Sequence, residues 1–263
     1  MTASTHIARP ITSTLLALGI TAFAGSLSAA TVNAASCQAV SAAQQVTVVE
    51  LYTSEGCDSC PPADRWLSGL KRRPDVLAAA FHVDYWDRLG WKDRFADPTF
   101  TARQAQTQSH SGAKFSYTPQ VLVNGRDWRR WPDLPTARQP AVVQVLLKRE
   151  QTDRVSVQVT PGAAAPAQLA LWWAVLEDDH SSAVKAGENA GVTLRHDHVV
   201  RSSGSRPAWR REQSEPWVIQ LPSRSDLSRP ALPAGAQPRA SRFLVVVTDA
   251  ATGAPLQAVE LAC

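Results

Sequence analysis

Predicted strands and helices alternate along the first part of the chain. Residues 45–53 are rich in β-branched side chains and predict a buried strand, and residues 63–71 predict a helix that follows Pro61-Pro62. The same patterns predict further strands over 76–84, 121–123 and 127–131, and further helices over 99–109 and within 134–150. The last of these helices rests on apolar residues at helical spacing, namely Ala141, Val142, Val145 and Leu146.

The pattern changes near residue 151, where helical periodicity gives way to short apolar runs between Gly, Pro and Ser clusters. Strands are predicted over 155–160, 168–176, 192–200, 217–221 and 243–248. Short strands at such spacing are typical of a small β-sandwich. The sequence therefore predicts an α/β domain over residues 36–150 and a β-rich, sandwich-like domain over residues 151–263.

Residues 1–35 resemble a secretory signal peptide. Arg9 supplies a thin positive region, residues 11–24 are apolar and uncharged, and small residues with acceptable cleavage sites follow, Val32-Asn33-Ala34 fitting best. The apolar run is short for a membrane span. We therefore expect export to the periplasm or the medium, with no stable membrane insertion after cleavage.

The composition and the missing motifs disfavour several classes of function. The chain has 263 residues, a formal net charge of +4 and 44% hydrophobic residues, enough for one large or two modest cores. So mild a positive balance does not favour nucleic-acid binding. The sequence contains no phosphate-binding loop, dinucleotide fingerprint, nucleophile elbow or H-E-x-x-H motif, and so predicts no cofactor.

Four cysteines carry the candidate chemistry. Cys57 and Cys60 lie between a predicted strand and a predicted helix, where unpaired backbone N–H groups and the helix dipole favour a reactive thiolate. Such a pair can attack a disulfide and resolve the mixed disulfide. Cys37 and Cys263 lie at the two ends of the mature chain, and we expect a structural disulfide between them, the alternative being two unpaired tails.

A threonine-proline pair strengthens the C-x-x-C signal. Thr118-Pro119 precedes the predicted strand 121–123 and the Asn124-Gly125 hairpin turn, about sixty residues after Cys57. Together these elements resemble the thioredoxin fold, in which this proline is cis and lies against the reactive pair.

Three sequence blocks indicate a particular family among proteins that resemble the thioredoxin fold. They are E-L-Y-T-S-E-G-C-D-S-C-P-P-A-D, F-H-V-D-Y-W-D-R-L-G-W-K-D-R-F and Y-T-P-Q-V-L-V-N-G-R. These blocks resemble those of the DUF1223 family of exported bacterial thioredoxin-like proteins of unknown function. The resemblance implies the fold and the compartment but no established substrate. On matching positions it implies Cys57 as the attacking thiol, Cys60 as the resolving thiol and Pro119 as part of a substrate groove.

The segment after the second predicted strand holds further candidates. Asp84 is a candidate proton acceptor for Cys60, as a buried acid is in thioredoxins. For the ring-bearing side chains around it we favour packing roles with hydrogen-bonded tips, namely for His82, Tyr85, Trp86 and Trp91.

Metal binding is the weaker alternative. His196 and His198 alternate on a predicted strand, but without an obvious third ligand we favour a solvated strand face. Cys57 and Cys60 with His82 or His110 form a conceivable thiolate–imidazole set. We predict no metal site.

These observations predict an exported thiol–disulfide oxidoreductase-like protein that exchanges with protein or small-molecule thiols and disulfides. Two alternatives stay open at this point. One is a non-enzymatic periplasmic binding protein in which Cys57–Cys60 is only a structural bridge. The other is a copper- or zinc-handling thiol protein.

Overall fold

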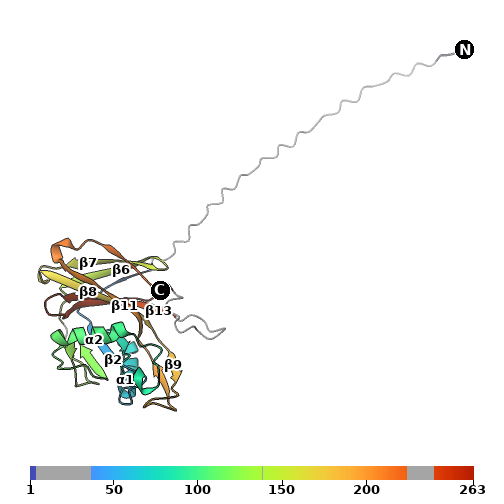
Figure 1. Cartoon of the computed structure of the whole chain (residues 1–263). Coiled ribbons are helices and arrows are strands. Elements are labelled where there is room, and N and C mark those ends of the chain that lie inside the picture. The colour runs from blue at the N-terminus through green and yellow to red at the C-terminus, as the bar shows by residue number, and fades with distance from the viewer. Residues whose placement is uncertain (4–36, 138, 224–239) are drawn as a thin grey trace. The chain divides into compact units, whose positions relative to one another are not determined.

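A computed structural model describes residues 1–3, 37–137, 139–223 and 240–263, and residues 35–263 form one compact unit (Figure 1). Apart from residues 1–3, the predicted signal peptide lies outside the described residues. Among the helices of the described segments, none is long and apolar enough to cross a lipid bilayer.

The described residues of this unit contain fourteen strands and two α-helices. The helices are α1 (Pro61–Gly69) and α2 (Pro98–Ser111), with short 3₁₀ turns η1 (Leu70–Arg72), η2 (Asp87–Leu89) and η3 (Arg211–Gln213). The strands are β1 (Gln38–Val40), β2 (Thr47–Thr53), β3 (Val76–His82), β4 (Gln120–Val123), β5 (Arg126–Asp127), β6 (Val143–Gln151), β7 (Arg154–Pro161), β8 (Gln168–Glu177), β9 (His180–Ala183), β10 (Thr193–His196), β11 (Val199–Arg210), β12 (Trp217–Gln220), β13 (Ser241–Asp249) and β14 (Pro255–Leu261).

One long sheet runs through both predicted domains. Its order among the described strands is β14-β13-β8-β11-β3-β2-β4-β5, with β2 and β3 parallel and the Val199–Ala80 pair joining β11 to β3. A second sheet has the order β1-β6-β7-β12, and β9 and β10 form a separate two-stranded sheet. The predicted boundary between residues 150 and 151 falls inside the β6–β7 hairpin, so it does not separate two sheets.

The two α-helices cover opposite faces of β3-β2-β4. Alternate residues of β2 point to opposite faces: Val49 and Leu51 share a buried cluster with Leu67 of α1, whereas Val48 shares one with Phe100 of α2. Helix α1 begins directly after the C-x-x-C segment with prolines in its first turn. Helix α2 is capped by Asp97, whose carboxylate accepts the Thr99 N–H at 2.8 Å.

The helix predicted within residues 134–150 is wrong, because strand β6 covers residues 143–151. Val143, Val145 and Leu147 are buried while the intervening Gln144 is exposed, which is the two-residue period of a strand. Four apolar residues at 141, 142, 145 and 146 also fit a helical spacing. The β-branched valines and the pairing of β6 with both β1 and β7 decide for the strand.

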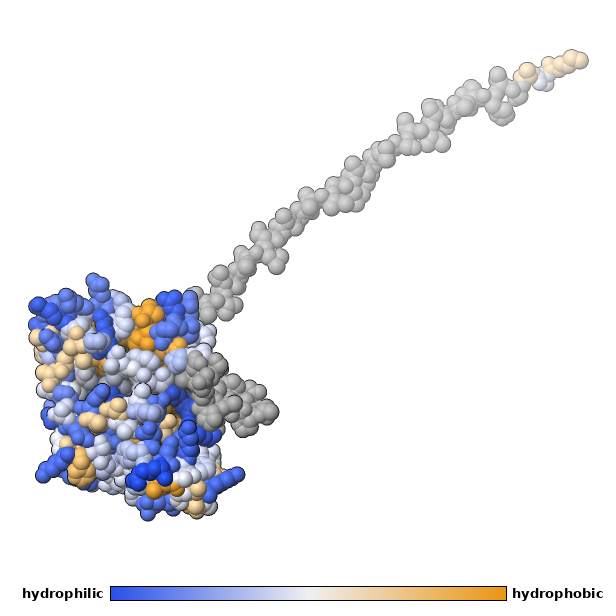
Figure 2. All heavy atoms as spheres, viewed as in Figure 1, coloured by the Kyte–Doolittle hydropathy of each residue, from blue (hydrophilic) through white to orange (hydrophobic). Residues whose placement is uncertain are grey.

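The β1-β6-β7-β12 sheet packs on one face of β8, β13 and β14 as a sandwich (Figure 1). Strands β8 and β13 are buried on both faces, since alternate residues such as Val245 and Val246 belong to different core clusters. The face drawn in Figure 2 is largely hydrophilic. Within the described part of residues 37–263, the exposed large hydrophobic side chains are Val40, Leu89, Phe115, Val192 and Val218.

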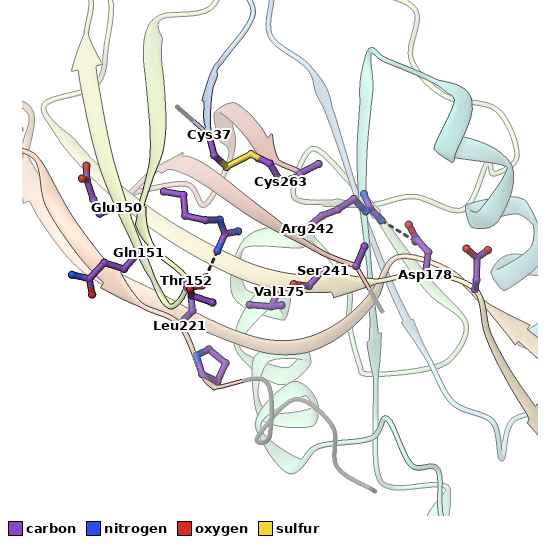
Figure 3. A pocket seen from close by; sticks show the side chains of 15 residues that line it. Cys37, Glu150, Gln151, Thr152, Val175, Asp178, Leu221, Ser241, Arg242 and Cys263 are labelled. Atoms are coloured by element: carbon purple, nitrogen blue, oxygen red, sulfur yellow. Dashed lines mark hydrogen bonds and ion pairs between the residues drawn. A yellow bond between two sulfur atoms is a disulfide. The ribbon is translucent and has the colours of Figure 1, made fainter. Parts of the chain in front are cut away.

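The expected disulfide between Cys37 and Cys263 is present, with 6.0 Å between the two Cα atoms. It ties the start of β1 to the residues after β14 and lies on the wall of a pocket of about 720 Å³ (Figure 3). Arg242, which is ion-paired with Asp178 at 2.8 Å, lines the same pocket. This pocket contains neither Cys57 nor Cys60.

Candidate functional site

The C-x-x-C segment lies between the end of β2 and the first turn of α1. Cys57 and Cys60 form a disulfide with 5.5 Å between their Cα atoms. Cys60 is the N-cap of α1 and adopts helical φ and ψ although a proline follows it, which places the pair at the N-terminal end of the helix. Both cysteines have an exposed fraction of 0%. The pair is therefore oxidised and completely covered.

A buried acid follows Cys60 by one helical turn. The Asp64 N–H donates to the Cys60 carbonyl oxygen at 3.1 Å, and the Asp64 carboxyl group accepts the Thr53 hydroxyl at 3.2 Å. Burial raises the pKa of Asp64, although the imidazoles of His196 and His82 oppose the shift. Residues four apart lie on the same helix face, so Asp64 and Cys60 face the same buried region.

A histidine–aspartate pair adjoins this acid. Nδ1 of His82, at the end of β3, lies 2.6 Å from Oδ2 of Asp93, and both side chains are fully buried. Burial alone lowers the pKa of His82, but the Asp93 carboxylate outweighs it and the net shift is upward. The pKa of Asp93 is lowered because the attraction of His82 exceeds the cost of burial. The geometry thus favours an imidazolium–carboxylate pair.

Glu55 connects the C-x-x-C segment to the same region. Its Oε2 accepts the Trp91 indole N–H at 2.7 Å, and its Oε1 lies 3.3 Å from Nε2 of His196. The ring of His196 is 5.0 Å from the ring of His82. Asp64, His82, Asp93, Glu55 and His196 together form what we call the buried ionisable cluster. It contains three carboxyl groups and two imidazoles under one disulfide.

Trp86 links the C-x-x-C segment to the predicted proline loop. The Thr118–Pro119 peptide bond is cis, and the Trp86 indole N–H donates to the Thr118 hydroxyl at 2.8 Å. The Trp86 Cβ lies only 3.0 Å from where a Cβ on Gly56 would be. Trp86 thus lies against the residue before Cys57 and is bonded to the residue before the half-buried Pro119.

Asp84, the proton acceptor expected for Cys60, is bonded to helix α2. Its Oδ1 accepts the Thr101 hydroxyl of α2 at 2.6 Å, and it is only half-buried. The expectations from the sequence do not include Asp64, although its position four residues after Cys60 in a predicted helix is a usable signal. They do not include Asp93 either, although it lies inside the F-H-V-D-Y-W-D-R-L-G-W-K-D-R-F block.

The solvated strand face predicted for His196-Asp197-His198 is wrong, because both histidines are buried. Strand β10 ends at His196, and His198 itself has φ 57° at the bend before β11 begins. His196 enters the buried ionisable cluster, whereas burial and the nearby Arg242 lower the pKa of His198 to about 4. Asp197 instead forms an ion pair with Lys71, with 2.8 Å between Oδ1 and Nζ.

The conceivable thiolate–imidazole set is only partly assembled. His82 lies in the buried ionisable cluster, but His110 is near the end of α2, where its side chain lies against Gly253 of the β13–β14 turn. Within the described segments, no group of three or more His, Cys, Asp or Glu residues has the arrangement of a metal site.

Two of the solved structures that resemble this chain each cover more than four fifths of it. Protein AGR_C_4864 from Agrobacterium tumefaciens is 24% identical, with a TM-score of 0.57 over 83% of this chain and 95% of that one. HBP35 of Porphyromonas gingivalis is 13% identical, with a TM-score of 0.54 over 84% of this chain and 76% of that one. At such identities the likeness concerns the fold alone. No curated protein matches the chain.

The comparison with family models gives the family. A model described as "Protein of unknown function (DUF1223)" matches residues 48–234. This range includes the C-x-x-C segment, the cis proline and every member of the buried ionisable cluster. Since the match covers more than half of the 263 residues, the chain belongs to the DUF1223 family.

Proposed function

We propose that this chain is an exported thiol–disulfide exchange protein in which Cys57 attacks and Cys60 resolves. The observation that carries the proposal is the Cys57–Cys60 disulfide at the N-terminal end of α1, with two members of the buried ionisable cluster, Glu55 and Asp64, on either side of it in the chain. A helix N-terminus stabilises a thiolate, and ionisable groups beside a cysteine pair provide sites for the protons that exchange releases and consumes. A purely structural disulfide needs neither a stabilised thiolate nor a nearby group that exchanges protons.

The proposal includes a thioredoxin-like arrangement of residues 36–150. Three features support it: the neighbouring strands β3-β2-β4-β5, the helices on opposite faces of them, and the cis Thr118–Pro119 bond before β4. The signal-peptide pattern at residues 1–35 and the two disulfides support a periplasmic or secreted location.

The proposed cycle begins with the reduced pair. The Cys57 thiolate attacks one sulfur of a partner disulfide, the other partner sulfur leaves as a thiolate, and a mixed disulfide forms. The Cys60 thiolate then attacks Cys57 Sγ, which closes the disulfide seen here and releases the second partner thiolate. The pair loses two electrons and the partner gains two; a partner dithiol drives the same steps in reverse.

The reduction potential of Cys57–Cys60 tests this proposal. The purified mature protein is equilibrated in glutathione buffers, its thiols are trapped, and each cysteine pair is quantified by peptide mass spectrometry. We expect a potential between about −270 and −120 mV, the span of known exchange catalysts. A value below about −300 mV is typical of a structural disulfide and would contradict the proposal.

The complete burial of both cysteines favours a second candidate, a non-enzymatic binding protein whose disulfide only stiffens the segment. Cys57→Ser distinguishes the two. Loss of exchange with a disulfide substrate, in a variant that still folds, supports the first. A folded variant with an unchanged phenotype in the producing cell supports the second.

A further inference from the structure

The β9–β10 hairpin is a separate unit inserted between two neighbouring strands. Strands β8 and β11 pair with each other up to Glu177 and Val199, and the hairpin occupies the residues between them. It pairs with no other described strand. Figure 1 shows β9 beside α1, beyond the ends of β8 and β11. An isolated two-stranded hairpin has little stability of its own, so contacts with its surroundings hold it.

Both connections to this hairpin bend sharply. Asp179, between β8 and β9, has φ 59°, and His198, between β10 and β11, has φ 57°. These are the left-handed values that non-glycine residues rarely adopt. The two bends are tied together, since Asp197 accepts the Asp179 N–H at 3.0 Å and Asp178 accepts the His198 N–H at 2.7 Å. These reciprocal bonds hold the base of the hairpin in place.

The hairpin loop is bound directly to the backbone of the C-x-x-C segment. The buried Asn189 side chain donates to the Glu55 carbonyl oxygen at 3.0 Å and to the Cys57 carbonyl oxygen at 2.8 Å. Glu188 accepts the N–H of Asp58 at 3.1 Å. All three bonds end on backbone atoms between residues 55 and 58, so the loop grips the segment that holds the disulfide.

We propose that the loop between β9 and β10, residues 184–192, is an autoinhibitory cap that must release the C-x-x-C segment before Cys57 can exchange with a partner. This inference rests on the proposed function for its biological purpose. Its structural basis is the 0% exposure of both cysteines together with the three bonds from Glu188 and Asn189. The closed form explains how a cysteine pair at a helix N-terminus is shielded from small thiols.

Reduction by dithiothreitol reports cap opening. A dithiothreitol thiolate attacks one sulfur of Cys57–Cys60, the other cysteine leaves as a thiolate, and the second dithiothreitol thiol closes the reagent's ring and frees the dithiol. The Cys37–Cys263 disulfide serves as an internal standard in the same molecule, because Cys263 is exposed. Alkylation and peptide mass spectrometry follow the two disulfides separately. In the wild type we expect Cys37–Cys263 to be reduced first.

Asn189→Ala is the principal variant. It removes both side-chain bonds to the segment, so we expect Cys57–Cys60 to be reduced about 30-fold faster, on the scale of about 1 kcal/mol for each of the two hydrogen bonds. Glu188→Ala removes one exposed bond and should give a smaller acceleration. Lys185→Ala, at an exposed position on the same loop, is the matched control and should leave the rate unchanged. Reduction of Cys37–Cys263 should be equally fast in all four proteins.

Low concentrations of guanidinium separate cap opening from global unfolding. If the cap opens locally, the logarithm of the Cys57–Cys60 reduction rate rises with denaturant much less steeply than the equilibrium slope of global unfolding predicts. Three results would contradict the proposed cap. They are a slope equal to that of global unfolding, an unchanged reduction rate of Cys57–Cys60 in Asn189→Ala, and an equal acceleration of the reduction of both disulfides. The reduction potential tests the proposed function independently, because it is an equilibrium quantity and not a rate.

Discussion

His82 and Asp93 form a buried ion pair, with 2.6 Å between Nδ1 and Oδ2 and no exposure of either side chain. The pair joins the end of β3 to the irregular segment before α2. It lies beside the acid that follows Cys60, so the electrostatics of the fold and of the candidate site depend on the same residues.

This pair makes stability depend on pH. The pKa of His82 is raised in the folded state, so its contribution is fully present below the unfolded value of about 6.5 and is lost as pH rises through the folded value. The pKa of Asp93 is lowered, so its contribution is present above about 3.9 and is lost as pH falls through the folded value. Asp93→Asn should cost about 3–5 kcal/mol at pH 6 by leaving His82 without its counter-ion.

Guanidinium unfolding at pH 6 and pH 8 measures this effect. The free energy of unfolding of Asp93→Asn should change less between the two pH values than that of the wild type. His82→Gln and the double variant complete a double-mutant cycle, whose coupling energy isolates the pair. A coupling energy near zero would show that the pair does not stabilise the fold.

Asp64 is expected to influence thiol chemistry where Asp84 does not. The raised pKa of Asp64 favours its uncharged form, which Asn imitates, so Asp64→Asn should fold normally. Removing its titration should change the pH profile of Cys57–Cys60 reoxidation. Asp84→Asn, which keeps an oxygen that can accept the Thr101 hydroxyl, should also fold normally and leave that profile unchanged. Identical profiles for all three proteins would remove Asp64 from the mechanism.

The contact between Gly56 and Trp86 should tolerate no added methyl group. A Cβ on Gly56 would lie 3.0 Å from Trp86 Cβ, so Gly56→Ala should displace the indole from Thr118 and cost about 1–3 kcal/mol. Gly69→Ala is the matched control, because no atom lies within 4 Å of a Cβ built there and alanine favours helix. Thermal unfolding should show a lower Tm for the first variant alone. Equal Tm values would mean that Trp86 yields without cost.

The terminal disulfide is expected to stabilise without taking part in exchange. Replacing Cys37 and Cys263 together with serine removes a cross-link across 226 residues of sequence and should lower the free energy of unfolding by about 2–5 kcal/mol. The reduction potential of Cys57–Cys60 should stay the same, because neither of these cysteines lines the pocket on which Cys37–Cys263 lies. A shift in that potential would show coupling between the two disulfides.

Local sequence predicted the elements that hold the cysteines. The β-branched run before Cys57, the prolines after Cys60 and the Asn124-Gly125 turn are signals within a few residues, and β2, α1 and the β4–β5 hairpin follow them. The helix prediction for residues 134–150 is wrong because the apolar residues fit both the helical and the strand period. Only the pairing of β6 with β1 and β7 decides for the strand.

Short-range patterns in the sequence specify the family, the position of Cys57–Cys60 before a helix and several strands of the second half. Strands β9 and β14 lie outside the predicted ranges, and the range 192–200 holds β10, a bend and the start of β11. Tertiary structure alone decided what surrounds the disulfide. Asn189 donates to the Cys57 carbonyl oxygen and His196 lies beside Glu55, although both belong to the β9–β10 hairpin, more than 130 residues later in the chain. No local pattern encodes such contacts, because they arise where the long sheet brings the two halves of the chain together.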